Sequence, residues 1–335
     1  MVTSSATAGP KRHHFVPKAY SRAWADTNGR VAVRRRAADS VYVTAIDNLG
    51  VESGLHGSGP LAVHRESIFS YLEDKWPRYR QELTSSGSLH ARDRRIASLF
   101  IALQIARTRE HILCTTFVER LAEAKQERPL TREAVCDFLR VELGADPGTQ
   151  EVEGAWTLAS FLADKGGLRS FDEAFSMSID VALKSLEPLI NALHWRVETV
   201  NEPVLWMSDR PVMPYRPPSD ADDLQGVGYA DCDEIRFPLS PSAMLVMTRR
   251  VPREGLARVS LHRFHDYNED IAAQCHEYVA CYPGRQERLK AVRLASHRPP
   301  VRFALGRGVR MAADGSGEPI GDIIQSWIPL RANEH

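Results

Sequence analysis

The amino-acid sequence predicts an α+β fold in which N-terminal and C-terminal strands form a mixed or antiparallel sheet around a helical middle segment. Two observations carry this prediction. Alternating or β-branched runs occur near the N-terminus and again after residue 193, whereas the intervening residues place apolar side chains at helical spacing. Strands gathered at the two ends of the chain favour α+β over an alternating β-α-β sheet.

The first strands follow a short extended piece and a turn. Pro17 favours an extended conformation in the residue before it, and Asn28-Gly29 is a preferred pair for a tight hairpin turn. Residues 30–35 then alternate apolar and polar side chains, which predicts a half-buried strand. Residues 41–44 are a second candidate strand.

The middle of the chain carries helical periodicity. Within residues 62–128, Leu72 and Trp76 fall on one helix face. Ser170 and Glu173 have the spacing of a capping box, in which the serine oxygen accepts a backbone N–H and the glutamate reaches back. A long apolar stripe behind Ser170 predicts a core helix.

After residue 193 the pattern changes to short strands. Residues 195–200 and 204–207 flank an Asn-Glu-Pro turn, which predicts a hairpin. Further strands are expected at residues 235–239, 244–248 and 258–264, and a helix at residues 268–282.

Composition narrows the class of protein without naming a reaction. The 335 residues include 43 basic and 43 acidic side chains and are 43% hydrophobic, which is typical of globular proteins and excludes a wholly disordered chain. A chain of this length buries a sizeable core without disulfides. No run of about 18 apolar residues occurs, so we expect no membrane association.

Domain limits and compartment follow from local composition. We expect a flexible tail at residues 1–10, a single α+β domain at residues 11–298, and a C-terminal extension packed on that domain at residues 299–335. The five cysteines are scattered, without a C-x-x-C pair, which favours free thiols. Together with the absence of a secretory pattern at the start, this predicts a cytoplasmic location.

Basic side chains dominate the segment from Lys11 to Arg36, where Asp26 alone opposes them. Such a stretch can contact nucleic acid or an acidic partner. The alternative is a solvated strand face, since nucleic-acid-binding domains usually carry a net positive charge and this chain is neutral.

Four segments resemble one known family. The opening Arg12-His-His-Phe-Val-Pro-Lys-Ala-Tyr20 is similar to the start of bacterial proteins grouped as domain-of-unknown-function family 4238, which open with His-His-x-x-Pro-x-x-Tyr. Gln104-Ile-Ala-Arg107, Ser208-Asp-Arg-Pro-Val212 and Phe237-Pro-Leu-Ser-Pro241 resemble three later motifs of that family. The resemblance implies membership, and the family's designation assigns no function.

His13 and His14 are candidate catalytic residues. Adjacent side chains in an extended segment point to opposite faces, so at most one of the two enters a given site. A neutral imidazole serves as a general base or a metal ligand near neutral pH. The alternative is structural: one histidine bonds a buried carbonyl and the other lies at the surface.

Asp209 is the candidate carboxylate. It follows an apolar strand, where it can hold His14 in one tautomer, bind a cation or pair with Arg107. Ser208 and Arg210 flank it as candidate substrate-binding residues. The alternative is a turn, because Ser and Asp favour turn starts and Pro211 fixes the exit.

Arg107 is the candidate anion clamp. It shares a helix face with Gln104, and a guanidinium offers a bidentate grip on carboxylate or phosphate. An intramolecular salt bridge to Asp209 or Glu73 is the alternative. Gln104 and Tyr20 complete the candidate substrate-binding residues.

Three classes of function remain open. The first is an enzyme acting on a small molecule or on an acyl or phosphoryl group, with His14 as base, Asp209 as its orienter and Arg107 on an anionic ligand. The second is a metal-dependent nuclease of the ββα type, in which Asn48 and His56 accompany His14 and a divalent cation. The third is a non-catalytic binding or regulatory module, possible in a bacterial defence or toxin setting.

Overall fold

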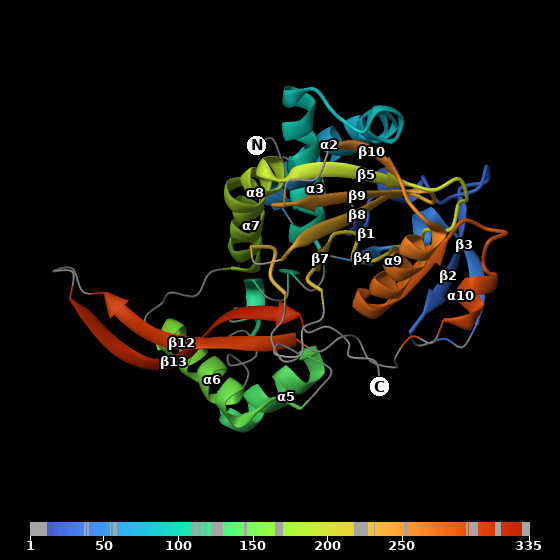
Figure 1. Cartoon of the computed structure of the whole chain (residues 1–335). Coiled ribbons are helices and arrows are strands. Elements are labelled where there is room, and N and C mark those ends of the chain that lie inside the picture. Colours follow the sequence, from blue (N-terminus) through green and yellow to red (C-terminus); the bar gives the residue numbers. More distant parts are fainter. Residues whose placement is uncertain are drawn as a thin grey trace, which may run out of the picture.

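The structure is a computed structural model that describes residues 12–36, 38, 40–53, 55, 59–108, 111–112, 115–117, 119–121, 130–143, 146–164, 170–217, 227–230, 232–250, 254–292, 294, 301–311 and 316–329. Helices occupy the middle of the chain, and strands precede and follow them along the sequence, so the predicted α+β class is confirmed (Figure 1).

The N-terminal region forms short strands as predicted. Its elements are β1 (Arg12–His14), α1 (Lys18–Ser21), β2 (Arg30–Arg35), β3 (Val41–Ala45), the 3₁₀ turn η1 (Ile46–Asn48) and β4 (Val51–Ser53). β1 pairs with β4, and β2 with β3, both antiparallel. The turn before β2 is fixed by the Asp26 carboxylate, which accepts the N–H groups of Asn28 and Arg30, and by Gly29 with φ +70°.

The helical middle also matches the prediction. It comprises α2 (Gly59–Ser86), α3 (Ala91–Ala106), α5 (Arg132–Leu143), α6 (Thr149–Asp164), α7 (Phe171–Val181), the π-helical turn η2 (Ala182–Leu186) and α8 (Glu187–Ala192). Both bonds of the Ser170–Glu173 capping box are present at the start of α7. Pro77 lies inside α2, which continues past it.

The predicted hairpin of residues 195–200 and 204–207 is wrong. β5 (His194–Thr199) pairs with β9 (Ala243–Thr248) and runs parallel to β10 (Gly255–Arg258). Residues after β5 cross to another sheet, where β6 (Met207–Ser208) pairs with β11 (Tyr278–Cys281). Residues 195–199 do lie in a strand, but of residues 204–207 only Met207 does, and the partners of both strands come from distant sequence.

The prediction of a strand at residues 258–264 and a helix at 268–282 is also corrected. α9 spans Leu261–Gln274, and the Ser260 hydroxyl caps its start by accepting the N–H of Arg263. Phe264, Tyr267 and Ile271 give this helix a buried stripe at helical spacing. β11 follows α9 as a buried strand, and α10 (Glu287–Ala291) comes after it.

Two main sheets form the body of the molecule. The sheet of order β3-β2-β11-β6 joins N-terminal to C-terminal strands, as predicted. Other C-terminal strands form a separate sheet of order β10-β5-β9-β8-β7, in which β7 is Met213–Tyr215 and β8 is Glu234–Ser240. One face of this second sheet packs on α2, α3 and the α7–α8 segment, whereas its other face packs on α9 (Figure 1).

The C-terminal segment forms a long hairpin of β12 (Val301–Met311) and β13 (Gly317–Pro329). It lies against α6 (Figure 1). Residues of α5 and α6 form a small apolar cluster together with Phe117 and Leu121. The boundary between the α+β domain and the C-terminal extension, expected at residue 298, stays a prediction. Within the described residues, no helix is both long enough and apolar enough to cross a membrane.

Candidate active site

The two adjacent histidines lie on β1 and have different surroundings. His13 is buried, and His14 is half-buried and lies opposite Val51 of β4. After β1, the N–H groups of Phe15 and Val16 both donate to the carbonyl of Gly50, which holds β1 against the end of the η1 turn. The expected division between the two faces of the strand therefore leaves His14 as the more accessible imidazole.

The environment of His14 keeps its imidazole neutral. Burial, and then the nearby Lys18 ammonium, lower the pKa of His14 below its usual 6.5, against smaller opposing effects of the Leu49 carbonyl and the Glu73 carboxylate. Its Nδ1 atom is buried and has no hydrogen-bond partner among the described residues. A neutral ring with one unoccupied nitrogen is the form that a general base requires.

Arg107 is held by two side chains, both of which the sequence singled out. Its Nη1 donates to Glu73 Oε1 at 2.8 Å and its Nη2 donates to Gln104 Oε1 at 2.9 Å. The guanidinium carbon lies 5.1 Å from the centre of the Phe69 ring. The Arg107 side chain is 2% exposed, whereas that of Glu73 is 25% exposed, so the carboxylate is the accessible member of the pair.

Local structure explains why these groups meet. Arg107 is the C-cap of α3, Glu73 lies in the middle of α2, and the two helices pack against each other. Gln104 donates to the Phe100 carbonyl one turn earlier, which turns its oxygen toward Arg107. The structure thus brings Glu73, Arg107 and Gln104 into hydrogen-bond contact, and Glu73 lies within electrostatic reach of His14. The salt bridge to Glu73 considered from the sequence is the one that forms.

Asp209 has different partners. Its carboxylate accepts the N–H of His276 at 2.8 Å and also the N–H of Glu277, in the loop between α9 and β11. Burial raises the pKa of Asp209 to about 7, despite these two hydrogen bonds. These bonds join Asp209 to a loop that is distant in sequence, and they include neither His14 nor Arg107. A catalytic role for Asp209 stays a prediction.

The remaining predicted binding residues are buried. The hydroxyl of Ser208 bonds the backbone of Arg210, accepting its N–H and donating to its carbonyl, so both belong to the Asp209 turn. Tyr20 is fully buried on α1, with its ring stacked on Phe237 at 5.2 Å.

The residues of the nuclease hypothesis are not assembled in the part of the chain that the structure describes. Asn48 ends η1 and is exposed, and His56 lies outside the described residues. Among the described residues, no group of three or more His, Cys, Asp or Glu side chains could hold a metal ion. A divalent metal cofactor therefore stays a prediction.

Several of the basic residues between Lys11 and Arg36 have intramolecular partners. Lys18 pairs with Asp47, and Arg35 pairs with Glu277 at 3.4 Å. The Arg36 guanidinium donates to backbone carbonyls at the C-terminal end of α9, including that of Cys275 at 2.7 Å. These contacts favour a structural use for part of the basic stretch, and its contact with nucleic acid stays a prediction.

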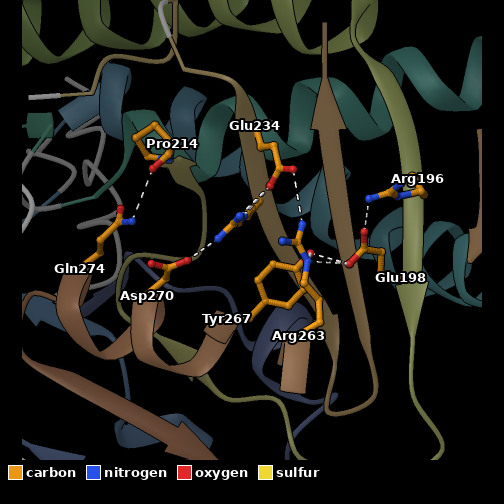
Figure 2. Close-up of polar contacts among 9 residues, drawn as sticks. Arg196, Glu198, Pro214, Glu234, Arg263, Tyr267, Asp270 and Gln274 are labelled. Atoms are coloured by element: carbon orange, nitrogen blue, oxygen red, sulfur yellow. Dashed lines mark hydrogen bonds and ion pairs between the residues drawn. The ribbon is translucent and has the colours of Figure 1, made fainter. Parts of the chain in front are cut away.

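A charge network on the second sheet was missed from the sequence. It lies between this sheet and α9, as Figure 2 shows. Its members are three arginines, three acids and a tyrosine: Arg196, Glu198, Glu234, Arg236, Arg263, Tyr267 and Asp270.

The most buried charged members of the network are Glu198 and Arg236. Glu198 accepts the Tyr267 hydroxyl hydrogen bond at 2.5 Å and pairs with Arg196 and Arg263. Arg236 pairs with Glu234 and Asp270. Opposite charges at alternate positions within an otherwise apolar strand were the sequence signal for this network.

Comparisons with known proteins identify the family of this chain but not its activity. No curated protein and no solved structure matches the chain. A family model described as "Protein of unknown function (DUF4238)" matches residues 12–283, which include His14, Glu73, Arg107, Asp209 and the charge network. This match covers most of the sequence and agrees with the four motifs noted above, and the chain therefore belongs to the DUF4238 family.

Proposed function

We propose that this protein is an enzyme that acts on a small molecule or on an acyl or phosphoryl group, with His14 as the general base. The observation that carries this proposal is the His14 ring, whose Nδ1 is buried without a partner among the described residues and whose pKa is lowered by burial, which favours the neutral form. An imidazole in this state accepts a proton from water or from a substrate hydroxyl.

Glu73 takes the role that the sequence suggested for Asp209. Its carboxylate raises the pKa of His14, so it stabilises the imidazolium that forms when His14 accepts a proton. Arg107 fixes the position of that carboxylate by a direct hydrogen bond. Since Arg107 is already paired with Glu73 and Gln104, we assign it to positioning Glu73 rather than to a direct grip on substrate.

The test is a panel of chromogenic substrates: p-nitrophenyl acetate, p-nitrophenyl phosphate and bis(p-nitrophenyl) phosphate. We expect turnover of at least one by the native chain, and a loss of about 10²- to 10⁴-fold in kcat/KM for His14→Asn. Glu73→Gln should lose activity in the same direction. The matched control is His90→Asn, an exposed histidine that should behave as the native chain.

The pH profile supplies a second readout. The kcat/KM of the native chain should rise with pH through an apparent pKa below 6.5, because the base must be neutral and its pKa is lowered. Turnover that is equal in the native chain and in His14→Asn contradicts the assignment of His14.

A nuclease is the second candidate function, favoured by one observation. β1 with His14 pairs antiparallel with β4, and the long helix α2 directly follows β4, although α1, β2 and β3 lie between the two paired strands in sequence. Hydrolysis of bis(p-nitrophenyl) phosphate that requires Mg²⁺ or Mn²⁺ and is abolished by EDTA would favour this candidate. Absence of turnover in every assay would favour the non-catalytic binding module. In each case we propose a cytoplasmic protein, since the described cysteines are free thiols.

A further inference from the structure

Three aromatic side chains near the candidate active site carry buried polar atoms without partners among the described residues. They are the hydroxyls of Tyr20 and Tyr278 and the Nε1 atom of Trp76. All three side chains are at most 1% exposed. Buried polar groups are nearly always hydrogen-bonded, so each exception requires an explanation such as a bound ion, water or ligand.

These atoms belong to one region of the fold, where α1, α2 and β11 meet the second sheet. Tyr20 stacks on the Phe237 ring at 5.2 Å, and Trp76 contacts the same ring at 5.4 Å. Burial raises the pKa of the Tyr278 hydroxyl, and the nearby Asp209 and Tyr20 raise it further, so Tyr20 lies close to Tyr278. Phe237 thus lies between two of the unpartnered groups, and Tyr20 connects them to the third.

A guanidinium adjoins the same region. Arg80 is half-buried, and its Nη1 donates to the carbonyl of Ala19, the neighbour of Tyr20. Burial lowers the pKa of Arg80, and no acidic side chain of the described residues forms an ion pair with it. Arg80 lies one helical turn after Trp76 on α2, so both face α1.

The chemistry of these four groups points to one class of ligand. An indole N–H and a guanidinium only donate hydrogen bonds, and each phenol donates one. A charged guanidinium that lacks a carboxylate partner favours an anion beside it. Water alone would satisfy the hydroxyls but would leave the partly buried positive charge of Arg80 without a counter-ion.

We propose that Arg80, Tyr20, Tyr278 and Trp76 form a subsite for the carboxylate or phosphate group of a small-molecule ligand. The centre of this subsite lies on the Arg80 and Tyr20 side. Asp209 adjoins Tyr278, and its negative charge disfavours an anion close to Tyr278. The inference goes beyond the proposed function, because it concerns binding and holds whether or not His14 is a base.

The experiment is thermal unfolding of the full chain in sodium phosphate, sodium acetate or sodium chloride at matched ionic strength. We expect phosphate or acetate to raise the Tm of the native chain by about 2–4 °C over chloride when the anion is about a hundredfold above its Kd. Tyr20→Phe and Arg80→Gln should lose most of this increase, and Tyr278→Phe part of it.

The phenylalanine variants keep the ring and are expected to fold. In chloride, each should be as stable as the native chain or more stable, because removing an unpaired buried hydroxyl removes an unfavourable group. Tyr71→Phe, at a tyrosine that is 55% exposed, is the matched control and should keep the full anion-dependent increase.

Two results would overturn the subsite. One is an equal Tm of the native chain in all three salts, and the other is an anion-dependent increase that persists in both Tyr20→Phe and Arg80→Gln. His14→Asn separates the two proposals, since it should lose turnover yet keep the anion-dependent increase in Tm. Both proposals would be supported if Tyr20→Phe loses the anion-dependent increase in Tm while the activity still depends on His14.

Discussion

Arg107, at the C-terminal end of α3, donates a 2.8 Å hydrogen bond to the carboxylate of Glu73, in the middle of α2. This contact ties together two consecutive helices, and it places a carboxylate within electrostatic reach of His14. Because the Arg107 guanidinium is nearly inaccessible to solvent, Glu73 provides its negative partner inside the protein.

Replacement of Glu73 should therefore destabilise the protein as well as impair its activity. We expect Glu73→Gln to lower the free energy of unfolding by about 2–3 kcal/mol, less than for a fully buried pair because Glu73 is partly exposed. Asp74→Asn, at the exposed neighbouring position, should change it by less than about 0.5 kcal/mol. Urea denaturation of both variants measures the difference, and equal stabilities would show that the pair contributes little.

The charge network predicts a larger effect at its most buried acid. Glu198→Gln leaves Arg196 and Arg263 without their shared carboxylate and should cost about 3–5 kcal/mol. Tyr267→Phe removes one hydrogen bond to a charged group and should cost about 1.5–3 kcal/mol. The exposed Glu269 on the same helix supplies the control variant Glu269→Gln. If Glu198→Gln unfolds at the same urea concentration as this control, the network does not stabilise the fold.

Gly50 and Gly29 form a matched pair for a test of packing beside His14. Both have positive φ, +61° and +70°, which costs a side chain about 1–2 kcal/mol. A Cβ on Gly50 would also lie 2.7 Å from the Cβ of the buried Val16, whereas a Cβ on Gly29 meets nothing within 4 Å. Gly50→Ala should thus be about 1–3 kcal/mol more destabilising than Gly29→Ala in chemical denaturation. Equal costs would mean that Val16 can move.

The raised pKa of Asp209 predicts a pH dependence of stability. Between pH 4 and about pH 7 the folded state retains the Asp209 proton and the unfolded state does not, so the free energy of unfolding falls as the pH rises through this window. Asp209→Asn should remove this component of the slope. Denaturation at pH 4.5, 6 and 7.5 compares the variant with the native chain, and Asp74→Asn is the control. Identical slopes for Asp209→Asn and the native chain would contradict the raised pKa.

Replacement of Lys18 should change the pKa of His14, the proposed general base. Burial and then the Lys18 ammonium lower the pKa of His14, so Lys18→Gln should raise that pKa. NMR titration of histidine side chains measures the change directly. Arg22→Gln, at an exposed residue on the turn after α1, should leave the His14 pKa unchanged. A downward shift in Lys18→Gln would contradict the assigned sign.

The sequence by itself determined the features that depend on neighbouring residues. The α+β class, the β2 and β3 strands and the capping box at Ser170 follow from side-chain periodicity and from short-range hydrogen bonds. The same local information placed Arg107 and Gln104 on one helix face, where they do bond each other. Such features are fixed within a few residues, and distant partners do not alter them.

Tertiary structure decided everything that depends on which distant segments meet. β5 pairs with β9 instead of with residues 204–207, and residues 278–281 become a strand because β2 and β6 flank them. Likewise, a sequence pattern cannot show that Glu73, rather than Asp209, is the partner of Arg107. The buried guanidinium of Arg107 is stable only beside a carboxylate. The packing of α2 on α3 places the Glu73 carboxylate there, and this packing therefore decides the partner of Arg107.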